Sequence, residues 1–166
     1  MWTARHHLYY GTYVGNLHRP LDLFTSFIQF AAGINLRAGC RAITTDACVP
    51  VSQLPEMLLK TRHDIDEAGL TAPLFGHVGD GNFHSLLLFD PEKPEEYEAC
   101  KRVSVKMGER AIELGGTCTG EHGIGTGKRL LLAEMVGSTG IDCMRAIKYA
   151  FDPKGLLNPG KVLSCL

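Results

Sequence analysis

The sequence has almost no net charge, because 17 lysines and arginines are balanced by 18 aspartates and glutamates, for a formal charge of −1 at pH 7. It lacks the basic excess with which proteins bind nucleic acid or anionic membranes, so neither is expected as a partner. It also lacks the apolar run of roughly 20 residues that a membrane-spanning helix needs. A conspicuous apolar stretch, residues 21–32, is interrupted by Asp22 and Gln29. We therefore expect no transmembrane span.

The six cysteines include no Cys-x-x-Cys pair and are spread from Cys40 to Cys165. This spacing lacks the compact framework of a small disulfide-rich domain, so reduced thiols are the expectation. Of the 166 residues, 45% are hydrophobic and 21% are charged, a balance that excludes a disordered tail or a fibrous protein. The length predicts one ordinary core and no second complete domain.

Hydrophobic periodicity predicts strands that alternate with helices. Strands are expected over residues 42–51, 74–78 and 82–89, with a short extended piece over 117–119, and helices over 52–69, 94–114, 128–135 and 140–151. The order strand, helix, strand, strand, helix, strand is that of a split βαβ unit. The expected fold class is therefore α+β, a ferredoxin-like split βαβ antiparallel sheet with helices on one face, plus a C-terminal helical extension.

Histidine and glycine are concentrated in two segments that point to a site. Residues 76–84 read Gly-His-Val-Gly-Asp-Gly-Asn-Phe-His, and a second glycine-rich stretch carries Glu121 and His122. Glycine costs backbone entropy, so its density around polar groups indicates unusual backbone angles or close approach. His77 and His84 are seven residues apart and would face opposite sides of a regular strand. They can converge only if residues 79–81, Gly-Asp-Gly, form a turn or a bulge.

A divalent metal is one use for these side chains. Two imidazoles, from His77 and His84, and the carboxylate of Glu121 would leave coordination positions open, as in a catalytic rather than a structural site. Zinc and manganese fit this set best, and the residues do not decide between them. The spacing by itself also leaves open that these are surface residues or hydrogen-bonded core residues.

Three ordered motifs carry a family resemblance. They are residues 76–84, residues 120–125 (Gly-Glu-His-Gly-Ile-Gly) and residues 152–161 (Asp-Pro-x-Gly-Leu-x-Asn-Pro-Gly-Lys). Together they resemble the C-terminal domain of FAD-linked D-2-hydroxy-acid oxidoreductases, and within that family the cytochrome-linked D-lactate dehydrogenases of mitochondria. Residues 2–6 are similar to the family's Trp-x-x-Arg segment.

The resemblance implies roles for single residues. His77, His84 and Glu121 are expected to ligate the family's divalent metal, and His122 is expected to be the general base of catalysis. Arg5 is similar to the arginine that binds the substrate carboxylate through a bidentate pair. The roles of His122 as general base and of Arg5 in substrate binding come from the resemblance.

The resemblance also implies FAD as a cofactor, with Asn158 in a tail that contacts the flavin. The family's flavin-binding domain precedes this region and is expected to be absent from these 166 residues. Residues 1–39 are then an upstream segment that holds the Trp-x-x-Arg piece and an atypical insert over residues 10–33. Residues 40–166 form the substrate and metal domain. We expect such a chain to be a fragment or a short isoform that is inactive alone.

The implied reaction is oxidation of a D-2-hydroxy acid to the 2-oxo acid, with metal-assisted proton removal and hydride transfer to flavin. Residues 84–86 read His-Ser-Leu where hydroxyglutarate enzymes resemble His-x-Asn, which favours a smaller substrate such as D-lactate. The electron acceptor is expected to be cytochrome c or an electron-transfer flavoprotein. The oligomeric state stays open.

Mitochondria are the location that the resemblance implies, although the N-terminal residues show no clear targeting leader. Cytoplasmic and peroxisomal locations are alternatives, since residues 164–166 (Ser-Cys-Leu) are close to the peroxisomal tripeptide. Two other functions also stay open. One is a non-catalytic metal-binding or regulatory module, and the other is a metallohydrolase that uses the same ligands.

Overall fold

The computed structural model describes residues 39–164. The predictions for Arg5 and for an insert over residues 10–33 lie outside the described residues. Residues from Ala42 onward belong to one compact unit. The elements in chain order are β1 (Arg41–Thr44), β2 (Ala47–Cys48), the 3-10 helix η2 (Val51–Gln53), α3 (Leu54–Glu67), β3 (Leu74–His77), the 3-10 helix η3 (Val78–Asp80), β4 (Asn82–Phe89), α4 (Pro94–Glu113) and α5 (Arg129–Phe151).

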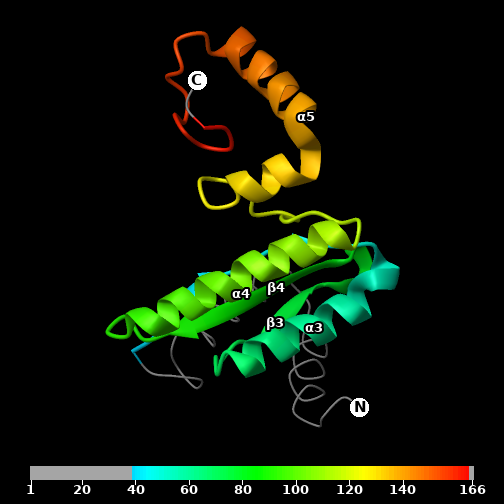
Figure 1. Cartoon of the computed structure of the whole chain (residues 1–166), viewed down its shortest axis with the longest axis vertical. Helices are drawn as coiled ribbons and strands as arrows, with labels where there is room; N and C mark the ends of the chain where they lie inside the picture. Colours follow the sequence, from blue (N-terminus) through cyan, green and yellow to red (C-terminus); the bar gives the residue numbers. More distant parts are fainter. Residues whose placement is uncertain (1–38, 165–166) are drawn as a thin grey trace, which may run out of the picture. The chain divides into compact units, whose positions relative to one another are not determined.

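The sheet is built around β4. One edge of β4 pairs antiparallel with β3, and the other edge pairs with β1 and, antiparallel, with β2. Thr117 adds an antiparallel bridge to Cys48, so the predicted fourth strand is reduced to a single bridge. Helices α3 and α4 lie side by side on one face of the sheet (Figure 1). This arrangement confirms the expected α+β antiparallel sheet with split βαβ order and helices on one face.

The strand predicted over residues 42–51 is broken at Thr45 and Asp46. Thr45 still bonds to β4, because its N–H donates to the carbonyl of Ser85 at 2.9 Å and its hydroxyl accepts the N–H of Ser85 at 2.8 Å. Asp46 uses its carboxylate to accept the backbone N–H groups of residues 120–122. The single strand predicted over residues 42–51 was therefore wrong: it is interrupted at Thr45 and Asp46, resumes only as β2, and has given way to η2 at Val51.

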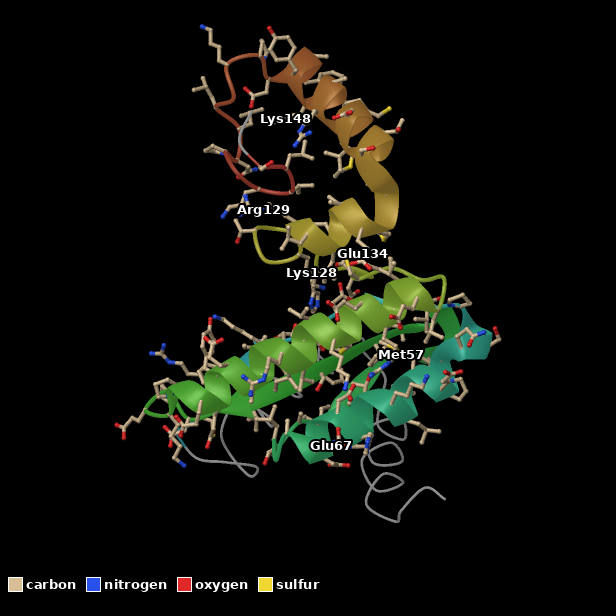
Figure 2. All side chains as sticks on the ribbon, viewed as in Figure 1. Met57, Glu67, Lys128, Arg129, Glu134 and Lys148 are labelled. Atoms are coloured by element: carbon tan, nitrogen blue, oxygen red, sulfur yellow. The ribbon has the colours of Figure 1, made fainter. Side chains whose placement is uncertain are left out.

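Alternate residues of β4 supply the two faces of the sheet. Phe83 and Leu87 pack among apolar side chains of the helices, among them Met57 of α3 (Figure 2). Burying a side chain of this kind stabilises the fold by about 1.5–3 kcal/mol. Asn82 and His84 alternate with these residues and point to the other face, where they too are buried. Because Phe83 and Leu87 are anchored in the core, Asn82 and His84 are held on the opposite face of β4.

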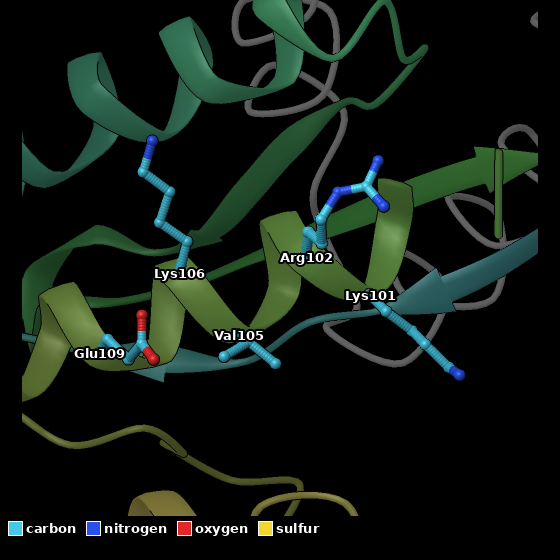
Figure 3. Close-up of a pocket in the computed structure, with 5 residues that line it drawn as sticks. All are labelled: Lys101, Arg102, Val105, Lys106 and Glu109. Atoms are coloured by element: carbon cyan, nitrogen blue, oxygen red, sulfur yellow. The ribbon is translucent and has the colours of Figure 1, made fainter. Parts of the chain in front are cut away.

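A buried carboxylate cross-links the two helices. Asp64 of α3 is 6% exposed and accepts hydrogen bonds from Lys106 at 2.5 Å and forms an ion pair with Arg110 at 2.6 Å, both on α4. Figure 3 shows Lys106 extending from α4 towards α3, at the rim of an open depression on α4. Burial by itself raises the pKa of Asp64, but the two cations hold it below its ordinary value. The two interactions of Asp64 therefore join α3 to α4.

The C-terminal part contains the two helices that the periodicity predicts. They form α5, which is interrupted at Gly137, where φ is 69° and ψ is 174°. After α5, the carboxylate of Asp152 accepts the N–H groups of Leu156 and Leu157 at 2.9 Å and closes a turn of the tail. Within residues 39–164, no helix is both long and apolar enough to cross a lipid bilayer.

Candidate metal centre

The β3–β4 hairpin brings His77 and His84 together. In its register His77 lies opposite Asn82 and Phe75 lies opposite His84, so both histidines point to the same face. The chain reverses through η3 and Gly81, whose φ of +74° favours glycine. A Cβ at Gly81 would also lie 1.9 Å from a backbone carbonyl oxygen. The turn expected over residues 79–81 is therefore what lets the two imidazoles converge, with ring centroids 5.9 Å apart.

Glu121 and His122 complete the cluster from the loop before α5. The Oε1 atom of Glu121 lies 3.0 Å from His84 Nε2 and 3.6 Å from His77 Nε2. One ligand atom from each of these three residues lies within 4.8 Å of the others. The ring of His122 stacks on that of His84 at 4.7 Å, with 14° between the planes. The four side chains singled out from the sequence therefore meet at one place.

His84 is held in the orientation that a metal ligand needs. Its side chain is 1% exposed, and Nδ1 lies 3.3 Å from the carbonyl oxygen of Thr45 and 3.6 Å from Oδ1 of Asp46. Because a carbonyl oxygen only accepts, the hydrogen of the neutral ring belongs on Nδ1. The lone pair then lies on Nε2, which is 3.0 Å from Oε1 of Glu121.

The Nε2 atom of His84 is buried and has no hydrogen-bond partner among the described residues, although Glu121 Oε1 is only 3.0 Å away. Two lone pairs at that distance repel each other unless a positive charge lies between or beside them. A divalent cation would satisfy both atoms, and its nitrogen and oxygen donors are those that zinc and manganese accept. The residues present therefore fit the expected metal.

Asp46 connects the histidine hairpin to the Glu121 loop. Its Oδ1 accepts the side-chain amide of Asn82 at 2.8 Å, and its Oδ2 accepts the hydroxyl of Thr119 at 2.7 Å. The N–H groups of residues 120–122 also donate to Oδ2, at 2.8, 2.9 and 2.8 Å. Burial by itself raises the pKa of Asp46, but these hydrogen bonds together hold it well below its ordinary value. Asp46, which is 3% exposed, is therefore a buried and charged carboxylate.

Lys128, labelled in Figure 2, stabilises the same junction. Its Nζ donates to the carbonyl oxygens of Asp46 at 2.8 Å and Cys118 at 2.6 Å. Burial lowers the pKa of Lys128, and the negative charge of Asp46 opposes that change. The lysine thus ties the two backbone segments on either side of the cluster to each other.

Reasoning from the sequence missed Asp46, Asn82 and Lys128 as residues of the site. The sequence did contain one indication of the role of Asp46, because aspartate is uncommon inside strands and a buried one needs a hydrogen-bond partner. No local pattern marks Lys128, whose partners are backbone carbonyls distant in the sequence. Asn158, expected to contact flavin, lies in the exposed tail, where its carbonyl accepts the N–H of Lys161, and it is not part of the cluster.

Protonation of His84 should destabilise the metal-free chain. Burial lowers the pKa of His84 below its ordinary value of 6.5, His122 adds to this, and the charges of Asp46 and Glu121 oppose it. The unfolded chain therefore takes up this proton at a higher pH than the folded chain does. Stability should fall as the pH drops through about 6.5 and level off below the pKa of the folded state.

Thermal unfolding measured with a chelator present, between about pH 7.5 and pH 5.5, checks this expectation. The Tm of the wild-type chain should decrease over that range, and the decrease should be smaller in His84→Gln, which has no proton to bind at this position. Equal slopes for the two proteins would contradict it.

The fold and the cluster define an α+β domain that gathers imidazole and carboxylate side chains on the sheet face opposite its helices. The family of FAD linked oxidases, C-terminal domain, matches residues 23–162, and the chain belongs to this family. The resemblance carried by the three sequence motifs is thereby confirmed.

Relatives at moderate identity agree with this family. The chain is 42% identical to a probable mitochondrial D-lactate dehydrogenase of Danio rerio, covering 98% of the chain and 29% of the relative. It is 45% identical to mitochondrial D-lactate dehydrogenase [cytochrome] 1 of Saccharomyces cerevisiae, covering 72% of the chain and 20% of the relative. Glycolate oxidase subunit GlcD of Bacillus subtilis is 40% identical, over 74% of the chain and 26% of that protein. The chain thus spans less than a third of these relatives.

A solved structure shares the fold. The 4-ethylphenol oxidase of Gulosibacter chungangensis, in an isoeugenol complex, superposes with a TM-score of 0.56 over 76% of this chain and 25% of that one. The sequence identity is 18%, so this similarity concerns the fold alone.

Proposed function

We propose that this chain is the substrate and metal domain of an FAD-dependent oxidoreductase that converts a D-2-hydroxy acid to the 2-oxo acid. The observation that carries the proposal is the convergence of His77, His84 and Glu121, with the His122 ring stacked against His84. D-lactate is the first substrate to test, because D-lactate dehydrogenases are among the relatives and Leu86 offers no polar group for a second carboxylate.

His77, His84 and Glu121 would hold the divalent metal, zinc or manganese. His84 is buried, whereas the side chains of His77 and Glu121 are 60% and 47% exposed, so the cluster opens to solvent on the side away from His84. Three protein ligands leave positions for substrate oxygens. When bound, the metal supplies Lewis-acid polarisation of the substrate hydroxyl and a template for its carboxylate.

His122 is the residue that we assign to proton removal. Its Nε2 lies 3.8 Å from Oε1 of Glu121 and its side chain is 31% exposed, so it can reach a hydroxyl held at the cluster and pass the proton to solvent. Arg5, in the part of the chain that the structure does not describe, would bind the substrate carboxylate. FAD supplies the acceptor for the C2 hydride when the whole enzyme is assembled, and Asn158 is expected to contact it.

The whole enzyme needs more than this chain. The chain covers 29% of the Danio rerio relative and 20% of the yeast relative, so we assign flavin binding to a part outside residues 1–166 and expect the isolated chain to be inactive. The yeast relative's name includes cytochrome, which supports cytochrome c as electron acceptor, with an electron-transfer flavoprotein as the alternative. The relatives' names also support a mitochondrial location.

Metal analysis and reconstitution test this function. After loading with zinc or manganese and gel filtration, the chain should retain about one equivalent of metal. Mixing it with a separately produced flavin-binding portion should restore D-lactate oxidation, measured by flavin reduction. Metal binding without restored oxidation would instead favour a regulatory module. Hydrolysis of test esters or peptides by the metal-loaded chain would favour a hydrolase, and no metal binding would reject the proposed site.

A further inference from the structure

We propose that Asp46 is the positioning residue of this centre, because its one carboxylate orients His84 and holds the Glu121–His122 loop against it. This inference rests on the proposed metal site and goes beyond it by assigning the side chain that assembles the site. The two carboxylate oxygens have separate partners on segments that are 36 to 76 residues from Asp46 in the sequence. No other residue named in the site bonds to both segments through its side-chain carboxylate.

The Oδ2 atom fixes the loop. It accepts hydrogen bonds from the N–H groups of Gly120, Glu121 and His122 and from the hydroxyl of Thr119. Hydrogen bonds to a charged acceptor are about twice as strong as those between neutral groups. Three consecutive N–H groups that converge on one oxygen leave the backbone little freedom. The directions in which the Glu121 and His122 side chains leave that backbone are thereby set.

The loop is pressed closely onto this carboxylate. A Cβ at Gly120 would lie 1.9 Å from Nδ2 of Asn82 and 3.0 Å from Oδ1 of Asp46. A residue with a side chain at Gly120 would therefore push the loop off Asp46. The absence of a side chain at Gly120 therefore allows the loop to lie against the Asp46 carboxylate.

The Oδ1 atom acts on the histidine hairpin. It accepts the amide of Asn82, which is adjacent to the turn, and lies 3.6 Å from Nδ1 of His84. A carboxylate beside Nδ1 favours the tautomer with hydrogen on that atom, which adds to the effect of the Thr45 carbonyl at 3.3 Å. Metal-bound histidines commonly donate their second N–H to such an acceptor. Asp46 therefore favours a lone pair on Nε2, the atom that faces Glu121.

Asp46→Asn separates positioning from bulk structural support. The variant keeps the shape of the side chain, but places an NH₂ group either beside His84 Nδ1 and the Asn82 amide or against the loop N–H groups. Loss of a residue that orients a ligand costs about 10- to 100-fold in metal affinity. We expect that loss for zinc, measured by competition with a chromophoric chelator. We also expect a larger fraction of the Nε2–H tautomer of His84, measured by ¹⁵N NMR of the metal-free chain.

Asp64→Asn is the matched control, because Asp64 is likewise a buried aspartate and its partners Lys106 and Arg110 lie outside the centre. It should lower the Tm while leaving the zinc affinity and the His84 tautomer unchanged. Should Asp46→Asn fail to fold, Thr119→Val removes a single donor to Oδ2 and should give a smaller affinity loss in the same direction.

The outcomes separate this inference from the proposed function. If Asp46→Asn binds zinc as tightly as the wild type and leaves the His84 tautomer unchanged, the positioning role is overturned. If Asp64→Asn weakens zinc binding as much as Asp46→Asn does, the effect is general destabilisation, and the role is again overturned. If the wild type binds neither zinc nor manganese, the proposed function fails, while the ¹⁵N spectra of the metal-free proteins still decide the role of Asp46.

Discussion

Replacing His122 by asparagine should lower kcat for D-lactate by about 10²- to 10⁴-fold in the assembled enzyme, the usual effect of losing a general base. His122 stacks on His84 but is not needed to complete the proposed ligand set of His77, His84 and Glu121. The metal content should therefore stay unchanged. Because the loss concerns a group that acts on the proton in the transition state, kcat and kcat/KM should fall together while KM changes little.

Steady-state kinetics of the chain combined with its flavin-binding portion measure this effect, with metal content determined on the same samples. His63→Asn is the control, since His63 is an exposed histidine of α3 that pairs with Glu67 away from the centre. A His122→Asn enzyme with wild-type kcat would assign proton removal to another group.

Hydrophobic patterning predicted the framework of the fold well because that framework depends on local periodicity. The strand over residues 82–89 and the helices that begin near Leu54 and Pro94 are found with nearly the predicted bounds. The apolar residues of these elements repeat at strand or helix spacing, and packing against one another reinforces the local preference. The interruption of α5 at Gly137 also follows from a local cause, the positive φ that glycine tolerates.

The patterning failed where tertiary contacts override it. Residues 42–51 read as one strand, but Asp46 uses its carboxylate to bind a loop more than seventy residues away. The fourth strand likewise shrinks to one bridge at Thr117, because the next residues turn to meet that carboxylate. Neither contact has a signature in the neighbouring sequence. Strand propensity could therefore not reveal which residues these contacts join. The single aspartate within the predicted strand, Asp46, indicated only that a polar partner was needed there.

The convergence of His77 and His84 could be predicted from their spacing and from the residues between them. His77 and His84 have opposite parity on a continuous strand, so any shared function required a turn between them, and the Gly-Asp-Gly triplet supplied it. What the sequence could not provide was the orientation of the rings. His84 takes its orientation from Thr45 and Asp46, which are 39 and 38 positions away in the sequence.

The two histidines proposed as metal ligands should respond differently to replacement by alanine, because His77 is exposed and His84 is buried. His77→Ala should abolish tight zinc binding but change the free energy of unfolding of the metal-free chain by no more than about 0.5 kcal/mol, as for surface substitutions in general. His84→Ala should also abolish zinc binding. Because His84 is 1% exposed and packs against Phe75 and His122, its loss should destabilise the metal-free chain by about 2–4 kcal/mol.

Zinc competition and urea unfolding, both on metal-free and metal-loaded protein, measure the two effects separately. For the wild type, excess zinc should raise the unfolding free energy, since a ligand that binds only the folded state stabilises it by mass action. Neither variant should gain this stabilisation. His63→Ala, which removes an exposed histidine outside the centre, should retain it. If His77→Ala were stabilised by zinc as the wild type is, the cation would not lie between the hairpin and Glu121, and the second ligand group, Asp46, His84 and His122, would become the site to test.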